Sequence, residues 1–285
     1  MTVYITLILV VIVIVIYYLS NTLKRKYNAE VRDGLNRVKN LGESVLTEKD
    51  ITHLPEPVQK YLKYAGVLGR EKVNNFKVSI NGTMKTDKNR DWFQVKIHQH
   101  SFLDKVTRLF YLNLNMSGIP VLGLHFYKNG IATMKIKILG FITAVKGMGE
   151  KMNRAETVTV FNDMCIMAPA SLIDTRIQWE TIDLYTVKAT FRNEGNCITA
   201  ALYFNDIGQL INFVSDDRYY SPTGKTFESV RWSTPVSSYK NINGFNLAAY
   251  GEAIWNFPDE DLCYAKFNIL DIKYNCKNDY NCKND

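Results

Sequence analysis

The sequence predicts a mainly β protein of the α+β class. We expect a curved antiparallel sheet or half-open β-barrel with one interrupting helix, preceded by a transmembrane helix and short amphipathic helices. Three observations predict this: an uncharged apolar run at the start, a helical spacing of apolar residues after it, and apolar–polar alternation over most of the remainder. Seventeen Tyr and fourteen Phe also favour strands, because flat rings pack well on a pleated sheet.

The first segment, residues 1–23, is predicted to be a transmembrane anchor. Residues 3–19 carry no charge and would reach ~25 Å as a helix, enough for a thin bilayer core. A cleaved signal peptide is the alternative, but the segment has neither a basic start nor a small-residue cleavage site. We therefore expect a single-pass membrane protein. The basic residues 24–26 favour a cytoplasmic domain, whereas β domains behind such anchors are common in exported proteins, so the membrane side stays open.

Residues 24–70 are predicted to form a membrane-proximal helical segment. Apolar residues recur every three or four positions over 28–45, and a second short helix over 58–65 has Pro before it and Gly66 after it. The positive charge gathers here, since residues 21–90 hold fifteen Lys and Arg against eight Asp and Glu, while the rest of the chain is balanced. Contact with a lipid surface is the expected consequence. No nucleic-acid-binding motif accompanies the charge, so we expect no nucleic-acid partner.

Residues 71–275 are predicted to form the antiparallel β domain. Short turns separate the runs, and short links force neighbouring strands to be antiparallel. Lys128-Asn129-Gly130 is typical of a type I′ hairpin turn. The expected strands cover residues 73–80, 92–100, 106–116, 121–128, 131–139, 178–182, 186–192, 197–204, 210–216, 226–232, 236–241, 245–257 and 262–274.

One helix interrupts this series at residues 147–163, where Met148, Met152, Ala155 and Thr159 recur at helical spacing. The final residues, 276–285, belong to a tandem hexapeptide, YNCKND, and are predicted to be a polar tail without a packing role. The five cysteines form no recognisable disulfide framework. Cys165, Cys197 and Cys263 lie among apolar residues, so we expect them to be buried.

Catalytic and metal-binding motifs are scarce. His98, His100 and His125 are conceivable metal ligands, but exposed strand histidines are the more common case, so we expect no metal and no cofactor. Acid–base chemistry would use carboxylates from the set Asp216, Asp217, Glu228 and Glu252. It requires at least two of them in one pocket, whereas charge pairs between strands are the ordinary alternative. We therefore lean against an enzyme and predict no catalytic residues.

The stretch LPEPVQKYLKYAGVLG at residues 54–69 resembles the opening of a bacterial family of unknown function, of the DUF6544 or DUF6920 type. Weaker likenesses follow in the expected order: LGF at 139–141, QWE at 178–180, FNDIG at 204–208, DRY at 217–219 and YKNING at 239–244. The resemblance implies an N-terminal hydrophobic segment and a β-rich domain, whose pattern is similar to the half-barrel of periplasmic lipoprotein carriers. It implies no activity and no catalytic residues.

Several strands are apolar on both faces, which indicates a concave wall that faces either a filled core or a hydrophobic cavity. The function we favour is binding of a lipid-like or other hydrophobic ligand by a membrane-anchored, non-catalytic protein. The alternatives are a structural or interaction module of the cell envelope with a filled core, for an unknown protein partner, and an unrecognised hydrolase. A space under roughly 300 Å³ would favour the filled core. The expected ligand-binding residues are Phe110, Leu112, Leu122, Leu124 and Phe126.

Overall fold

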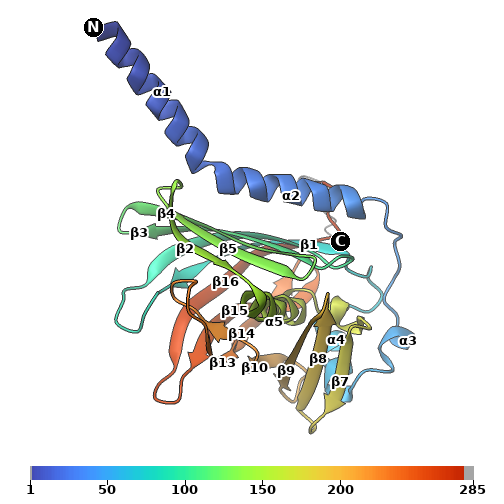
Figure 1. The fold of residues 1–285 in the computed structure, drawn as a ribbon. Coiled ribbons are helices and arrows are strands. Elements are labelled where there is room, and N and C mark those ends of the chain that lie inside the picture. Colours follow the sequence, from blue (N-terminus) through green and yellow to red (C-terminus); the bar gives the residue numbers. More distant parts are fainter. Residues whose placement is uncertain (1, 279–285) are drawn as a thin grey trace.

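The computed structural model of the protein describes residues 2–278 and shows one large curved sheet with a helix inside the curve and another across its outer face (Figure 1). The helices are α1 (Thr2–Ser20), α2 (Thr22–Val38), α3 (Glu48–Ile51), α4 (Glu56–Ala65) and α5 (Glu150–Met167), with a 3₁₀ turn at Pro169–Ile173. The strands are β1 (Asn75–Met84), β2 (Phe93–Phe102), β3 (Thr107–Met116), β4 (Ile119–Lys128), β5 (Ile131–Ile138), β6 (Ile142–Met148), β7 (Ile177–Thr181), β8 (Thr186–Asn193), β9 (Asn196–Phe204), β10 (Leu210–Ser215), β11 (Tyr219–Tyr220), β12 (Glu228–Ser229), β13 (Arg231–Ser233), β14 (Val236–Ile242), β15 (Phe245–Asn256) and β16 (Leu262–Tyr274).

The main sheet has fourteen strands in the order β6-β5-β4-β3-β2-β1-β16-β15-β13-β10-β9-β8-β7, with β14 paired to β15. Its neighbouring strands are antiparallel, and the first strand, β1, pairs with the last, β16, in the middle of the sheet. The two outermost strands, β6 and β7, do not pair with each other, so the sheet is curved but not closed. The predicted fold class is confirmed.

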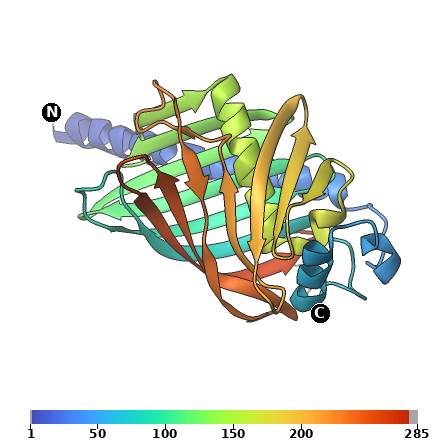
Figure 2. The ribbon, with the colours of Figure 1, turned by 90° about the horizontal axis from the view of Figure 1, so that it is seen from below.

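Helix α5 lies inside the curve and packs between β5 and β9 (Figure 2). Its ring Phe161 is fully buried and lies 5.4 Å from the ring of Phe191 and 5.7 Å from that of Phe213. Helix α5 begins at Glu150, three residues later than predicted, because residues 142–148 form the edge strand β6, which the sequence analysis did not expect. The interrupting helix is therefore present, and it fills much of the concave side.

Helix α1 extends away from the sheet, and its large apolar side chains, such as Ile8 and Leu9, are exposed (Figure 1). Within residues 2–278, Val3–Ser20 is the helix that is long and apolar enough to cross a membrane, with a mean hydropathy of 2.8. Helix α2 follows after a single residue and lies across the outer face of β3 and β4. It begins and ends several residues earlier than the predicted helix over 28–45.

The turn at Asn129-Gly130 agrees with its prediction, whereas the burial of the cysteines agrees only in part. Asn129 and Gly130 have φ of 53° and 72°, positive as a type I′ turn requires. The expectation of three buried cysteines is wrong for two: Cys165 is buried, but Cys263 is half-buried and Cys197 is exposed. Cys197 occupies an outward position of β9, next to the inward and fully buried Ile198, so the alternation of the strand exposes it. The expectation that the tail has no packing role is wrong at its first residue, because Cys276 is 1% exposed and packs in the hydrophobic cluster that holds α2. Residues 279–285 of the predicted tail lie outside the described residues.

Candidate ligand-binding site

A cavity lies between α5 and the concave face of the sheet. It encloses about 180 Å³ of space that water molecules can occupy, within about 980 Å³ of atom-free volume that is partly open to solvent. The enclosed volume exceeds that of a ~150 Å³ engineered cavity that binds benzene, but lies below the ~300 Å³ of a small drug pocket. The enclosed part therefore suits one ring or part of one alkyl chain, and a longer ligand would extend towards the open side.

Most of the cavity wall is apolar and comes from β1, β3, the end of α5 and the strands β13–β16. These elements place large side chains towards α5 because alternate residues of a strand face the same side. The apolar lining residues are Ile80, Met84, Phe110, Leu112, Ile166, Met167, Trp232, Val236, Ala248, Ala253, Phe267 and Ile269.

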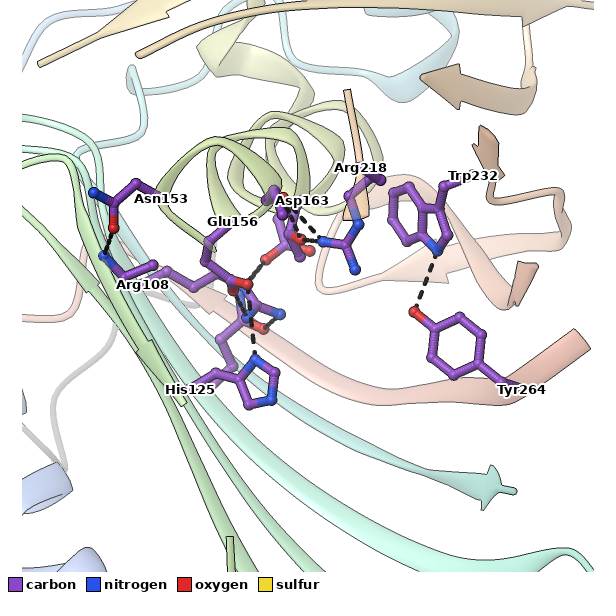
Figure 3. A network of polar contacts seen from close by, with 12 residues as sticks. Arg108, His125, Asn153, Glu156, Asp163, Arg218, Trp232 and Tyr264 are labelled. Atoms are coloured by element: carbon purple, nitrogen blue, oxygen red, sulfur yellow. Dashed lines mark hydrogen bonds and ion pairs between the residues drawn. The ribbon is translucent and has the colours of Figure 1, made fainter. Parts of the chain in front are cut away.

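A buried network of charged side chains lies at the part of the cavity where α5 meets β2 and β3 (Figure 3). The Arg108 guanidinium donates from Nε to Asp163 at 2.6 Å and from Nη1 to Glu156 at 2.7 Å. Its Nη2 donates to the Gln99 side chain at 3.2 Å, and Gln99 in turn donates to Asp163 at 2.7 Å. The three charged side chains are each less than 10% exposed, so Arg108 offsets the charge of its two carboxylate partners in surroundings largely shielded from bulk water.

The two carboxyl groups respond differently to this environment. Burial raises the pKa of Asp163, and the Arg108 charge offsets this only in part. Burial also raises the pKa of Glu156, but Arg108, His125 and Arg218 together lower it to about 2. Glu156 is thus the more firmly ionised of the two, because three groups that are or can become cationic surround it.

Two further polar groups face the cavity, one from each side. His125 of β4 is partly exposed, and its Nδ1 lies 3.7 Å from Glu156 Oε2, too far for a normal hydrogen bond. Arg218, which directly precedes β11, donates from Nη1 to the carbonyl of Ala155 at 3.0 Å and to the hydroxyl of Thr159. Its guanidinium carbon lies 4.4 Å from the centre of the Trp232 ring. The Trp232 Nε1 donates to the Tyr264 hydroxyl at 3.2 Å (Figure 3).

The five residues predicted to bind a ligand fall on two faces of the sheet. Phe110 and Leu112 line the cavity, whereas Leu122, Leu124 and Phe126 pack on the outer face in the cluster that also holds α2. The register explains the difference: Phe110 lies opposite His125 and Leu112 opposite Gly123, and residues directly opposite in a ladder share a face. The expectation that all five share the concave wall is therefore wrong for the three β4 residues.

The histidines divide in the same way. Gln99 lies opposite Phe110, so the inward face of β2 carries Gln99, while His98 and His100 face outward. His125 faces the cavity, and these three histidines cannot meet at one metal ion. Within residues 2–278, no three side chains among His, Cys, Asp and Glu gather closely enough to hold a metal.

The carboxylates considered for acid–base chemistry do not converge either. Asp216 pairs with Arg231 at 2.8 Å, and Asp217 pairs with Arg154 at 2.6 Å. Glu228 is exposed on β12, and Glu252 alone of the four is among the residues that line the cavity. The geometry required for the hydrolase hypothesis is therefore not met by this set.

Other polar residues do converge, and the sequence alone did not indicate them: Arg108, Glu156, Asp163 and Arg218. A weak signal was present, since Glu156 and Asp163 are seven residues apart and so share one face of the predicted helix. Arg108 also occupies an inward position in an otherwise apolar stretch of β3. Such charges usually lie on a solvated face, and only the fold shows that they meet.

Residues 44–267 match the model of a family of unknown function, DUF6544. The chain belongs to this family. The match extends from just before α3 into β16, and it therefore includes the cavity residues on α5 and on β1–β4. Among curated proteins, no relative matches the chain.

Solved structures with a similar fold are distant from this DUF6544 member. A domain described as an outer membrane lipoprotein-sorting protein from Vibrio parahaemolyticus has 6% identity and a TM-score of 0.40, with 70% of this chain and 85% of that chain covered. A LolA superfamily protein from Nitrosomonas europaea has 10% identity and a TM-score of 0.41, with 77% and 92% covered. A DUF1329 family protein from Desulfovibrio piger has 9% identity and a TM-score of 0.46, with 80% and 93% covered.

Proposed function

We propose that the protein binds a lipid-like or other hydrophobic ligand in the cavity between α5 and the sheet, without covalent chemistry, while α1 anchors it in a membrane. The observation that carries the proposal is the apolar wall around this cavity, to which Phe110 and Leu112 contribute. Burial of alkyl groups there is favourable by ~25 cal/mol per Å² of apolar surface. The anchor would keep the cavity close to membrane lipid and raise its effective concentration.

Photo-crosslinking tests this function on the full chain in nanodiscs. The probe is decanol with a photoreactive diazirine at the end of its tail, and the labelled residues are located by mass spectrometry. We expect labels on residues that line the cavity, such as Leu112 and Ile166, and competition by unmodified decanol. Label confined to α1 and the outer face, around Leu124 and Phe126, would contradict the proposal.

A variant that fills the cavity makes the test specific. Ala253 is buried and lines the cavity, so Ala253→Phe should remove the cavity label while the label on α1 stays constant. The matched control is Ala144→Phe, which places the same ring at an exposed position of β6 and should leave the cavity label unchanged. Thermal unfolding of both variants checks that they fold, since overpacking costs about 1–3 kcal/mol.

The small enclosed volume specifically favours the second candidate, an envelope interaction module with a nearly filled core. For such a protein, 180 Å³ would be a packing defect without a ligand. In that case, Ala253→Phe should fill the void and raise the unfolding temperature, and no probe should label the cavity in the unchanged chain.

A further inference from the structure

A second feature of the cavity concerns the chemistry of the ligand's head. Arg218 directly precedes β11 and lines the cavity beside the apolar residues of β13 and β14. Its guanidinium stacks over Trp232 at 4.4 Å and lies 5.4 Å from the centre of the Trp255 ring. This stacking holds the planar group in place at the border between the polar network and the apolar wall (Figure 3).

The bonds of Arg218 leave part of its donor set unused. Its Nη1 donates to two neutral acceptors on α5, the carbonyl of Ala155 and the hydroxyl of Thr159. Its Nε is buried and has no acceptor in the described part of the chain. Arg108, in the same cavity, differs because its Nε, Nη1 and Nη2 all donate to side chains. An unsatisfied donor on a buried charged group is costly, and an acceptor from a ligand would remove that cost.

The unused edge of Arg218 is the one with which other arginines of this protein bind carboxylates. Arg37 donates to Asp104 from Nε and Nη2, at 2.7 and 3.0 Å. Arg231 binds Asp216 through the same two atoms, at 2.8 and 3.2 Å. On Arg218, the Nε of this edge has no protein acceptor, and its hydrogen bonds within residues 2–278 all come from Nη1. The Nε–Nη2 edge matches two oxygens of a carboxylate or phosphate.

The carboxylates that line the cavity already have other partners, since Glu252 accepts a hydrogen bond from the Tyr250 hydroxyl at 2.6 Å. Glu156 is close enough for Arg218 to lower its pKa, but the Glu156 carboxylate hydrogen-bonds to Arg108. Asp163 is held by Arg108 and Gln99. Both carboxylates of the network are therefore engaged by Arg108, which leaves the Nε of Arg218 open to an acceptor from a ligand.

We propose that the ligand is a single-chain anionic amphiphile, whose carboxylate or phosphate head binds the Nε–Nη2 edge of Arg218 while its alkyl chain lies along the apolar wall. This rests on the proposed function, because it assigns a head group to the ligand of the same cavity. The chain lies against side chains such as Val236 and Ile269, and the enclosed volume of about 180 Å³ holds part of one alkyl chain and leaves no room for a second. A carboxylate and a phosphate would both accept hydrogen bonds from this edge, and the experiment below distinguishes the two.

The test compares three probes with the same diazirine tail: decanol, decanoate and decyl phosphate. The full chain in nanodiscs of zwitterionic lipid is labelled at a pH at which both anionic heads are ionised. We expect at least one anionic probe to label the cavity about tenfold more strongly than decanol, as a charge-assisted bond to Arg218 implies. Preference for decanoate or for decyl phosphate identifies the source of the anion, and either supports the proposal.

Variants of Arg218 assign the preference to this side chain. Arg218→Met should abolish the preference and keep labelling by decanol, whereas Arg218→Lys, which keeps the charge but loses the two-donor edge, should reduce it. The matched control, Arg231→Met, removes a nearby arginine whose carboxylate partner lies outside the cavity and should keep the full preference. If Arg218→Met fails to fold, the proposal is still tested by two measurements. These are the preference of the unchanged chain for an anionic probe and the smaller preference expected of Arg218→Lys.

The outcomes separate this proposal from the proposed function. Cavity labelling by all three probes without preference would overturn the anionic head and leave hydrophobic binding in place. A preference for anionic probes that remains in Arg218→Met would also overturn the role of Arg218 and leave hydrophobic binding in place. No cavity labelling by any probe would overturn both.

Discussion

The two arginines of the cavity differ in what surrounds them. Arg108 is 6% exposed and is held by Glu156, Asp163 and Gln99, so its charge stabilises the fold. Arg218 has a buried Nε without an acceptor in residues 2–278, which is why we propose that it binds the ligand. In a complete buried pair the attraction and the hydrogen bonds offset much of the desolvation cost, but the loss of one member leaves an uncompensated buried charge.

Removal of Arg108 should therefore be strongly destabilising. We expect Arg108→Met to lower the free energy of unfolding by about 3–5 kcal/mol, since two carboxylates lose their buried partner. The control is Arg154→Met, which breaks a partly exposed pair with Asp217 and should cost ~1 kcal/mol or less. Denaturant titrations of both variants measure the difference. Equal, small losses would show that Arg108 does not neutralise the network.

Glu156 gives a pH dependence with a definite sign. Its pKa is lowered from 4.5 to about 2 in the folded protein, so its ionised form stabilises the fold above pH 4.5. This stability is lost as the pH falls from 4.5 through about 2. Over that window, thermal unfolding of the unchanged chain should depend more steeply on pH than that of Glu156→Gln. Parallel curves for the two proteins would contradict the lowered pKa.

At the scale of elements, the contact between α2 and the sheet depends on one small residue. Gly34 of α2 lies over the ring of Phe102, where an added Cβ would come within 2.3 Å of ring atoms. Val31 and Leu35 are buried on the same face of the helix. The close approach brings α2 down onto the outer face, so that it covers the β4 residues Leu124 and Phe126.

This close approach predicts the effect of Gly34→Ala. In an exposed helix the change stabilises by ~1 kcal/mol, but here we expect destabilisation by about 1–3 kcal/mol, because the methyl group meets the Phe102 ring. In a Phe102→Leu background the same change should cost much less. Chemical unfolding of the single and double variants measures this coupling. A stabilising Gly34→Ala in the unchanged background would show that α2 does not pack this closely.

The sequence predicts those features of the fold that depend on neighbouring residues, and it does not predict contacts between distant segments. Alternation and turn residues predicted most strands, and the Asn129-Gly130 turn was placed correctly. The pairing of β1 with β16 has no local signal, because it joins segments almost two hundred residues apart. The network of Arg108 with Glu156 joins residues 48 apart for the same reason. Both faces of β4 are apolar, so the sequence did not show which face meets α2 and which meets the cavity.

At the scale of the whole molecule, α1, α2 and the sheet form a continuous arrangement. The Ser20 hydroxyl at the end of α1 donates to the carbonyl of Leu139 in the β5–β6 turn at 3.2 Å. Arg25 stacks over Tyr18 at 3.6 Å across the junction between the two helices. A bilayer around α1 would therefore lie close to α2 and to the basic residues that follow α1.

The membrane anchor is tested by extraction. The full chain should stay with membranes in alkaline carbonate, whereas a chain that begins at Asn21 and keeps α2 should be released. Mass spectrometry of the intact protein should show residues 2–20 still attached. Release of the full chain, or a mature N-terminus beyond Ser20, would contradict the anchor and favour a signal peptide.

The ligand in the cavity is tested most directly by analysis of what the protein retains. The full chain and its Ala253→Phe variant are purified from the same membranes, and lipid extracts of equal protein amounts are compared by mass spectrometry. We predict that the unchanged chain carries close to one equivalent of a single-chain amphiphile that Ala253→Phe lacks, because the added ring occupies the cavity. The same lipids in equal amounts on both proteins, or none on either, would contradict ligand binding in this cavity.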